Sequence, residues 1–178
     1  FLVLFVCAAL LLWQVGFVNA FNFMDGVNGI SVAQTLVAGL SWMIVGHVEG
    51  IPILVTGGAV IAAAALGFAP FNFPRASVFL GDVGSYFLGA WLATLFALGV
   101  LEGAPFMAMM APLLVYVADT SVTLLKRIHA GKTWYAAHKE HVYQRLNQSG
   151  LSHSQTTLIA AFFMTLCSTL GLLALVAA

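Results

Sequence analysis

Three polar stretches interrupt an otherwise apolar sequence, and the first two carry carboxylates or amides next to glycine. In the first stretch, Phe21–Gly29 with the preceding Asn19, the residues Asn19, Asn22, Asp25 and Asn28 recur at every third position. Residues three apart lie on neighbouring sides of one helical turn, so a frayed helix end could direct several of them into one cavity. Their oxygens suit a hard cation or a phosphorylated sugar. Simple capping of a helix end by Asn and Gly is the alternative.

The second stretch, Phe71–Tyr86, places Asp82 between two glycines and an aromatic residue, Phe79, just before them. A carboxylate beside apolar spans needs a positive partner. We therefore expect Asp82 to bind a divalent metal, because Mg²⁺ takes one or two carboxylates together with substrate phosphate oxygens. We expect Ser85 to cap the following helix. Phe79 could stack on a flat base, although a buried or interfacial aromatic is the simpler interpretation.

The third stretch, Lys126–Gln155, is basic and rich in histidine. Anionic lipid alone would explain part of its charge. A zinc site through His138 and His141 is only weakly indicated, and Lys126 stands where a Walker motif would need glycine. A basic loop opposite two acidic ones fits neutralisation of a phosphate. Asp119, just upstream, is expected either to pair with these cations or to hydrogen-bond a neighbouring helix.

Composition places these stretches in an all-α polytopic membrane protein. Hydrophobic residues make up 62% of the 178 residues and charged residues only 7%, whereas an average soluble domain is about a quarter charged. The two cysteines indicate no disulfide or zinc framework, and we expect no nucleic-acid partner. We treat residues 1–178 as one integral-membrane domain. Six stretches are long and apolar enough to span a bilayer, namely Phe1–Ala20, Ile30–Val48, Ile51–Phe68, Ser85–Leu101, Pro105–Leu125 and Thr156–Ala177. Pro112 should kink the fifth.

The distribution of charge predicts an orientation. All six lysines and arginines fall in the second and third polar stretches, which the positive-inside rule assigns to the cytoplasm. Alternation then places the first stretch on the same side and Phe1 outside. Because the sequence opens inside a hydrophobic run without a basic leader, we expect a fragment of a longer protein and not a signal peptide.

Three motifs resemble those of the polyprenyl-phosphate N-acetylhexosamine-1-phosphate transferases of glycosyltransferase family 4. NAFNFMDGVNG is similar to that family's N-A-x-N-x-x-D-G-x-D-G loop, and FNFPRASVFLGDVGS to its N-x-x-P-A-x-x-F-M-G-D-x-G-S loop. The segment from Asp119-Thr120 to HKEHVYQRL resembles its last cytoplasmic loop. The motifs occur in the family's order over essentially the whole chain, and they most resemble the branch that initiates O-antigen or other surface polysaccharides.

The resemblance implies transfer of a sugar-1-phosphate from a UDP-N-acetylhexosamine to undecaprenyl phosphate, with release of UMP. This would be the first membrane step of surface-polysaccharide or cell-wall synthesis, at the cytoplasmic face of a bacterial inner membrane. Mg²⁺ would be the cofactor, with Mn²⁺ as a substitute, and a homodimer is compatible with the resemblance. The implied roles are metal binding by Asp82 and catalytic roles for Asn22 and Asp25, which would line the cleft, and for His141, which would touch phosphate. Substrate binding is implied for Asn28, Asn72, Phe79, Lys132 and Arg145.

Several positions depart from the family pattern. Asn28 replaces the usual second aspartate of the first motif, Arg75 replaces a proline, Tyr143 replaces the second histidine of the third motif, and His138 stands where aspartate is common. The family's paired-aspartate motif is missing, so we expect the fragment alone to be inactive. The alternative function is a transporter or channel fragment with an ion site. A purely structural membrane subunit would leave the polar loops unexplained.

Overall fold

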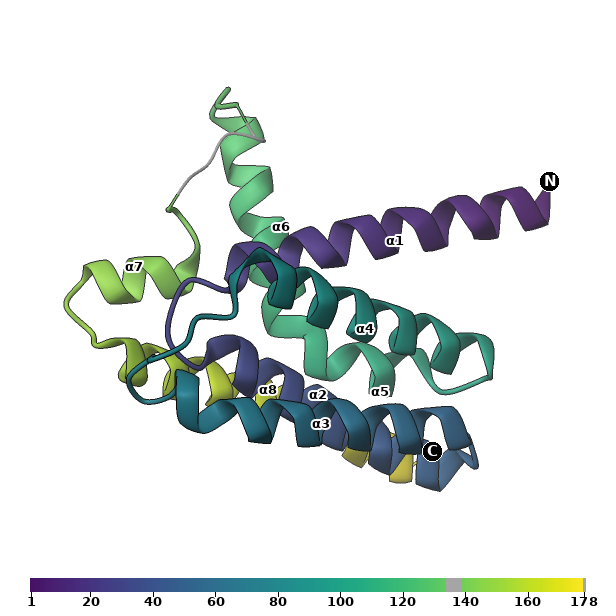
Figure 1. Cartoon of the computed structure of the whole chain (residues 1–178). Coiled ribbons are helices and arrows are strands. Elements are labelled where there is room, and N and C mark those ends of the chain that lie inside the picture. The colour runs from purple at the N-terminus through teal and green to yellow at the C-terminus, as the bar shows by residue number, and fades with distance from the viewer. Residues whose placement is uncertain (134–138, 178) are drawn as a thin grey trace.

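The structure, a computed structural model, describes residues 1–133 and 139–177, and the regular elements in these ranges are helices (Figure 1). Six helical stretches are long and apolar enough to cross a membrane, which confirms the predicted all-α polytopic fold. The elements are α1 (Leu2–Met24), α2 (Ile30–Glu49), α3 (Pro52–Asn72), α4 (Gly81–Leu101), α5 (Phe106–Met110), a 3₁₀ turn (Ala111–Leu113), α6 (Leu114–His129), α7 (Val142–Gln148) and α8 (His153–Val176).

Small residues let α2 and α3 pack closely along each other (Figure 1). A Cβ atom placed on Gly39 of α2 would lie 2.7 Å from the carbonyl oxygen of Gly58 on α3, so the two backbones meet where neither residue has a side chain. The second helix pair is α1 with α4. There the Trp13 indole donates to the carbonyl of Ala93 at 3.0 Å.

The fifth span is broken at Pro112, as the sequence predicted. Proline lacks an N–H and its ring collides with the preceding turn, and here a 3₁₀ turn separates α5 from α6, which run in different directions (Figure 1). Side chains of α2 satisfy backbone carbonyls at the break. Gln34 donates to Pro112 O at 2.8 Å, and Trp42 donates to Met109 O at 2.9 Å.

Three helices extend further toward the polar stretches than the sequence indicated. α1 continues to Met24 and α3 to Asn72, while α4 begins at Gly81. The expectation that Ser85 caps α4 was therefore wrong, because Ser85 lies a turn inside the helix. Gly81 has a left-handed φ of +63°, which glycine adopts without steric cost, so the irregular segment ends there. Asp82 then occupies the first turn, where the helix dipole favours a negative charge.

The ends of five helices lie at the same end of the bundle. α1 and α3 finish there, and α2, α4 and α8 begin there, as the residues that line one cavity between them demonstrate. The first two polar stretches connect these helices in pairs, α1 to α2 and α3 to α4. The first and second polar stretches, which are distant in sequence, therefore line the same cavity.

Candidate active site

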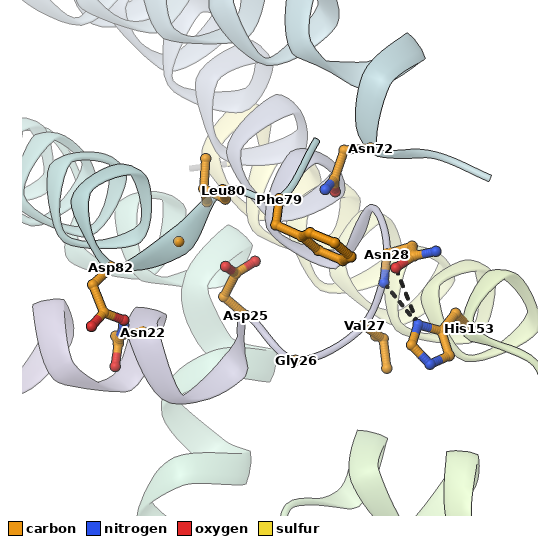
Figure 2. A pocket seen from close by; sticks show the side chains of 11 residues that line it. Asn22, Asp25, Gly26, Val27, Asn28, Asn72, Phe79, Leu80, Asp82 and His153 are labelled. Atoms are coloured by element: carbon orange, nitrogen blue, oxygen red, sulfur yellow. Dashed lines mark hydrogen bonds between the residues drawn. The ribbon is translucent and has the colours of Figure 1, made fainter. Parts of the chain in front are cut away.

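A cavity of about 290 Å³ lies where these helix ends meet (Figure 2). Its walls come from the first and second polar stretches and from the first residue of α8. The lining residues are Asn22, Asp25, Gly26, Val27, Asn28, Asn72, Phe79, Leu80, Gly81, Asp82 and His153. Six of the residues predicted from sequence therefore share one cavity.

At one end of the cavity, Asn22 connects the last turns of α1 to the first turn of α4. Its side-chain amide donates to Asp82 Oδ1 at 3.1 Å and is 2.8 Å from the hydroxyl of Ser85. Asn22 thus holds the carboxylate in place from the opposite helix. Asn19 lies three residues before Asn22 and belongs to the same repeating pattern. Its side chain donates to Val15 O one turn earlier, and it does not line the cavity.

Asp25 follows α1 directly and lies in the middle of the cavity, between Asp82 and Phe79 (Figure 2). The hydroxyl of Ser31, in the first turn of α2, donates to Asp25 Oδ1 at 2.7 Å. Burial raises the pKa of Asp25, the Ser31 hydrogen bond opposes this, and the negative charge of Asp82 raises the pKa further. The two carboxylates are therefore close enough to interact electrostatically, and a shared cation would relieve their repulsion.

Asn28 and His153 form the other end of the cavity (Figure 2). Nδ1 of His153 lies 3.3 Å from the Asn28 backbone nitrogen and 3.2 Å from Asn28 Oδ1. The hydroxyl of Thr157, one turn further along α8, donates to Asn28 O at 2.7 Å. Sequence reasoning did not single out His153 as a site residue. Its position at the start of an apolar span, at the end of the basic stretch, was the available signal.

Asn72 joins the two stretches through both ends of its carboxamide. Oδ1 accepts from the backbone N–H of Gly29 at 2.8 Å, and Nδ2 donates to the carbonyl of Val78 at 2.9 Å. Gly29 itself has φ +83° and lies against Phe73, so a residue with a side chain would be strained there. Asn72 is buried and supports the cavity wall.

Phe79 is the exposed aromatic of the cavity. Its side chain is 75% exposed, and the ring extends over the cavity between Asp25 and Asn28 (Figure 2). An aromatic face left open to solvent beside amides and carboxylates is available to a flat ligand group. The alternative of a buried Phe79 is therefore wrong, whereas an interfacial aromatic stays an open alternative.

The predicted residues of the third stretch lie outside the cavity lining. His141 is 2% exposed and precedes α7, with Nδ1 3.4 Å from Asp119 Oδ1. Lys132 pairs with the Glu140 carboxylate at 3.0 Å, and Arg145 Nε donates to Glu140 O at 2.9 Å. Their predicted contacts with phosphate stay predictions. His138 lies outside the described residues.

The donor set of the cavity fits a hard divalent cation. Among the described residues, the cavity lining contains two carboxylates and several amides but no lysine or arginine. Within residues 1–133 and 139–177, no three His, Cys, Asp or Glu side chains gather as a metal site. The two carboxylates of the cavity suit Mg²⁺, which takes one or two carboxylates and completes its coordination with water and phosphate.

Comparison with known proteins gives a consistent result. The sequence model described as Glycosyl transferase family 4 matches residues 1–100. The probable undecaprenyl-phosphate N-acetylglucosaminyl 1-phosphate transferase of Bacillus subtilis is 33% identical over 83% of this chain and 42% of its own length. The decaprenyl-phosphate N-acetylglucosaminephosphotransferase of Mycolicibacterium smegmatis is 33% identical over 82% of this chain and 41% of its own.

A further relative matches a shorter segment of the chain. The phospho-N-acetylmuramoyl-pentapeptide-transferase of Streptococcus thermophilus is 41% identical over 53% of this chain and 27% of its own length. The chain spans about two fifths of the first two relatives. None of these similarities favours a transporter or channel.

Proposed function

The chain belongs to glycosyl transferase family 4, and from this membership and the cavity we propose that the protein containing it transfers a sugar-1-phosphate from a UDP-N-acetylhexosamine to undecaprenyl phosphate and releases UMP. The observation that carries the proposal is the meeting of Asp25 and Asp82 with Asn28 and Phe79 in one cavity. The names of the first two relatives describe transfer of an N-acetylglucosamine phosphate to undecaprenyl or decaprenyl phosphate, and the name of the third describes transfer of a phospho-N-acetylmuramoyl-pentapeptide.

The two ends of the cavity suit the two parts of a nucleotide sugar. Phe79 offers an exposed ring for uracil, and the amide of Asn28 lies beside it with hydrogen-bonding capacity. The Asp82 carboxylate lies at the other end and the Asp25 carboxylate in the middle, and both residues line the same cavity (Figure 2). α2, α4 and α8 all begin at the cavity, so the positive ends of their dipoles favour an anionic ligand such as a diphosphate.

Asp82 and Asp25 would hold Mg²⁺, with Mn²⁺ as a substitute. When bound, the cation supplies Lewis-acid polarisation of a phosphoryl oxygen and neutralises negative charge. Asn22 orients Asp82 through its 3.1 Å hydrogen bond. Ser31 orients Asp25 and favours its ionised form. Asn72 holds the two loops at a fixed separation.

The location of the cavity also suits a lipid substrate. It opens at one end of helices that are apolar enough to cross a membrane, where a polyprenyl phosphate would present its head group. By the positive-inside rule, the cations of the second and third stretches support placing this end on the cytoplasmic side, and we propose that the membrane is a bacterial inner membrane. The family's paired-aspartate motif does not occur in these 178 residues, so we expect activity to require the longer protein.

The test uses membranes from cells that express the full-length protein. They are incubated separately with radiolabelled UDP-N-acetylglucosamine, UDP-N-acetylgalactosamine and UDP-glucose, and lipid-extractable label and UMP are measured. The proposal predicts label in lipid and an equal amount of UMP from at least one acetamido sugar, both dependent on Mg²⁺. Label in lipid with release of UDP, or no lipid label with any of the three, would contradict it.

A further inference from the structure

Tyr143, in the first turn of α7, is packed against the segment that carries Asp25. It is 3% exposed, and its hydroxyl donates to the backbone carbonyl of Phe23 at 2.8 Å. The same hydroxyl accepts from the side-chain amide of Gln144 at 3.0 Å. Phe23 lies in the last turn of α1, two residues before Asp25. The contact therefore fixes the backbone from which the carboxylate projects.

The same ring determines what can stand at position 26. A Cβ atom on Gly26 would lie 2.1 Å from the Tyr143 hydroxyl oxygen and 2.8 Å from a ring carbon. Gly26 is not among the glycines with positive φ, so the backbone itself would accept alanine. Glycine is needed here because the phenol occupies the space of a side chain.

Tyr143 is in turn held by the start of α7. Both carboxylate oxygens of Asp119, on α6, lie within 3.1 Å of the Val142 backbone nitrogen, and the hydroxyl of Thr123 donates to Oδ1 at 3.1 Å. At the same turn, the N–H of His141 donates to the Gln144 side chain at 3.1 Å. A buried carboxylate that accepts from a helix start is a strong anchor, so the position of Tyr143 is fixed from α6.

We infer that Tyr143 is a positioning residue for Asp25, acting through the Phe23 carbonyl and through its contact with Gly26. This rests on the proposed function. It gives α7 a structural connection to the cavity, although the predicted site residues His141, Lys132 and Arg145 do not line it. Tyr143 stands where the family resemblance leads us to expect histidine, so in this chain a phenol holds the loop. Burial raises the pKa of Tyr143, which keeps the hydroxyl protonated as a donor.

The test measures UMP release by the full-length protein, by three single variants and one double variant, and by two control variants. Tyr143→Phe removes only the hydroxyl, and we expect kcat to fall about tenfold, equivalent to about 1.4 kcal/mol, while KM for the UDP-sugar changes less than about twofold. Gly26→Ala should lower kcat at least as much. Tyr143→Ala opens the space, so Gly26→Ala should cost nothing further in that background. Gly67→Ala, whose new Cβ meets no atom within 4 Å, and Tyr86→Phe on exposed α4 surface are the matched controls.

Three results would overturn the inference: an unchanged kcat for Tyr143→Phe, a raised KM at constant kcat, or an equal loss from Gly26→Ala in both backgrounds. If the unmutated protein releases no UMP, the proposed function fails. The contact between Tyr143 and Gly26 is then tested by thermal unfolding. Gly26→Ala should then lower the unfolding midpoint by about 2 °C or more with Tyr143 present and not in the Tyr143→Ala background. An equal shift in both backgrounds would overturn the inference.

Discussion

Replacing Asn72 by alanine should separate a supporting role from a ligand-binding role. In the structure the carboxamide receives the Gly29 N–H at 2.8 Å and donates to the Val78 carbonyl at 2.9 Å. One partner belongs to the first polar stretch and the other to the second. Asn72→Ala therefore removes the connection between the two walls of the cavity and leaves both backbone groups without their partner.

The size of the effect follows from these two groups. A buried polar group that loses its hydrogen bond costs about 1–3 kcal/mol, so two of them cost about 2–6 kcal/mol. Water can reach part of this site, so the lower half of that range is the reasonable expectation. A loss of about 2–4 kcal/mol is a large share of a stability of about 5–15 kcal/mol. The variant should fold but unfold at a clearly lower temperature.

The assay combines thermal unfolding in detergent with UMP-release kinetics on the full-length protein. We expect Asn72→Ala to lower both the unfolding midpoint and kcat, because the walls that carry Asp25 and Asp82 lose their fixed spacing. Asn19→Ala is the control, since Asn19 donates only to Val15 one turn away. If Asn72→Ala unfolds at the wild-type temperature and raises the KM without lowering kcat, this reasoning is refuted. Asn72 would then chiefly contact the nucleotide.

Three further predictions concern two residues that line the cavity and Ser31, which contacts the cavity residue Asp25. Phe79→Ala should raise the KM for the UDP-sugar with little effect on unfolding, because the ring is 75% exposed; an unchanged KM would exclude stacking. Burial raises the pKa of Asp25 and the Ser31 hydroxyl lowers it, so Ser31→Ala should move the acid limb of the pH–rate profile to higher pH. An unmoved limb would mean that ionisation of Asp25 does not determine it. His153→Ala should raise the KM through loss of its contact with Asn28; a fall in kcat alone would contradict this.

The sequence was informative where a motif is local. The clustering of Asn22, Asp25, Asn28, Phe79 and Asp82 in one cavity follows from their positions at helix ends, which apolar span lengths place at one side of the membrane. A break at Pro112 was equally predictable, since the proline ring acts on its own helix. In these cases the physical cause lies within a few residues of the effect.

Features that depend on packing between distant helices were not predictable. Asn72 lines the cavity as expected, but its amide is committed to two backbone groups that no pattern identifies. His153 reaches the cavity because α8 begins there. Conversely, Lys132 pairs with the Glu140 carboxylate and Arg145 donates to the Glu140 backbone carbonyl, since cations can find partners within their own segment before reaching a neighbour. The start of α4 was misplaced because Gly81 in the left-handed region allows a helix to begin earlier than Ser85 suggested.

The most direct test of the central claim measures Mg²⁺-dependent UMP release by Asp82→Asn in the full-length protein. Asparagine keeps the size of the side chain and an oxygen that can accept from Asn22, so the substitution removes mainly the negative charge. Glu102→Gln, an exposed carboxylate at the opposite end of α4, is the matched control. If Asp82 holds the cation, its variant loses Mg²⁺-dependent turnover and the control keeps it. Near-normal turnover with Asp82→Asn would contradict the account.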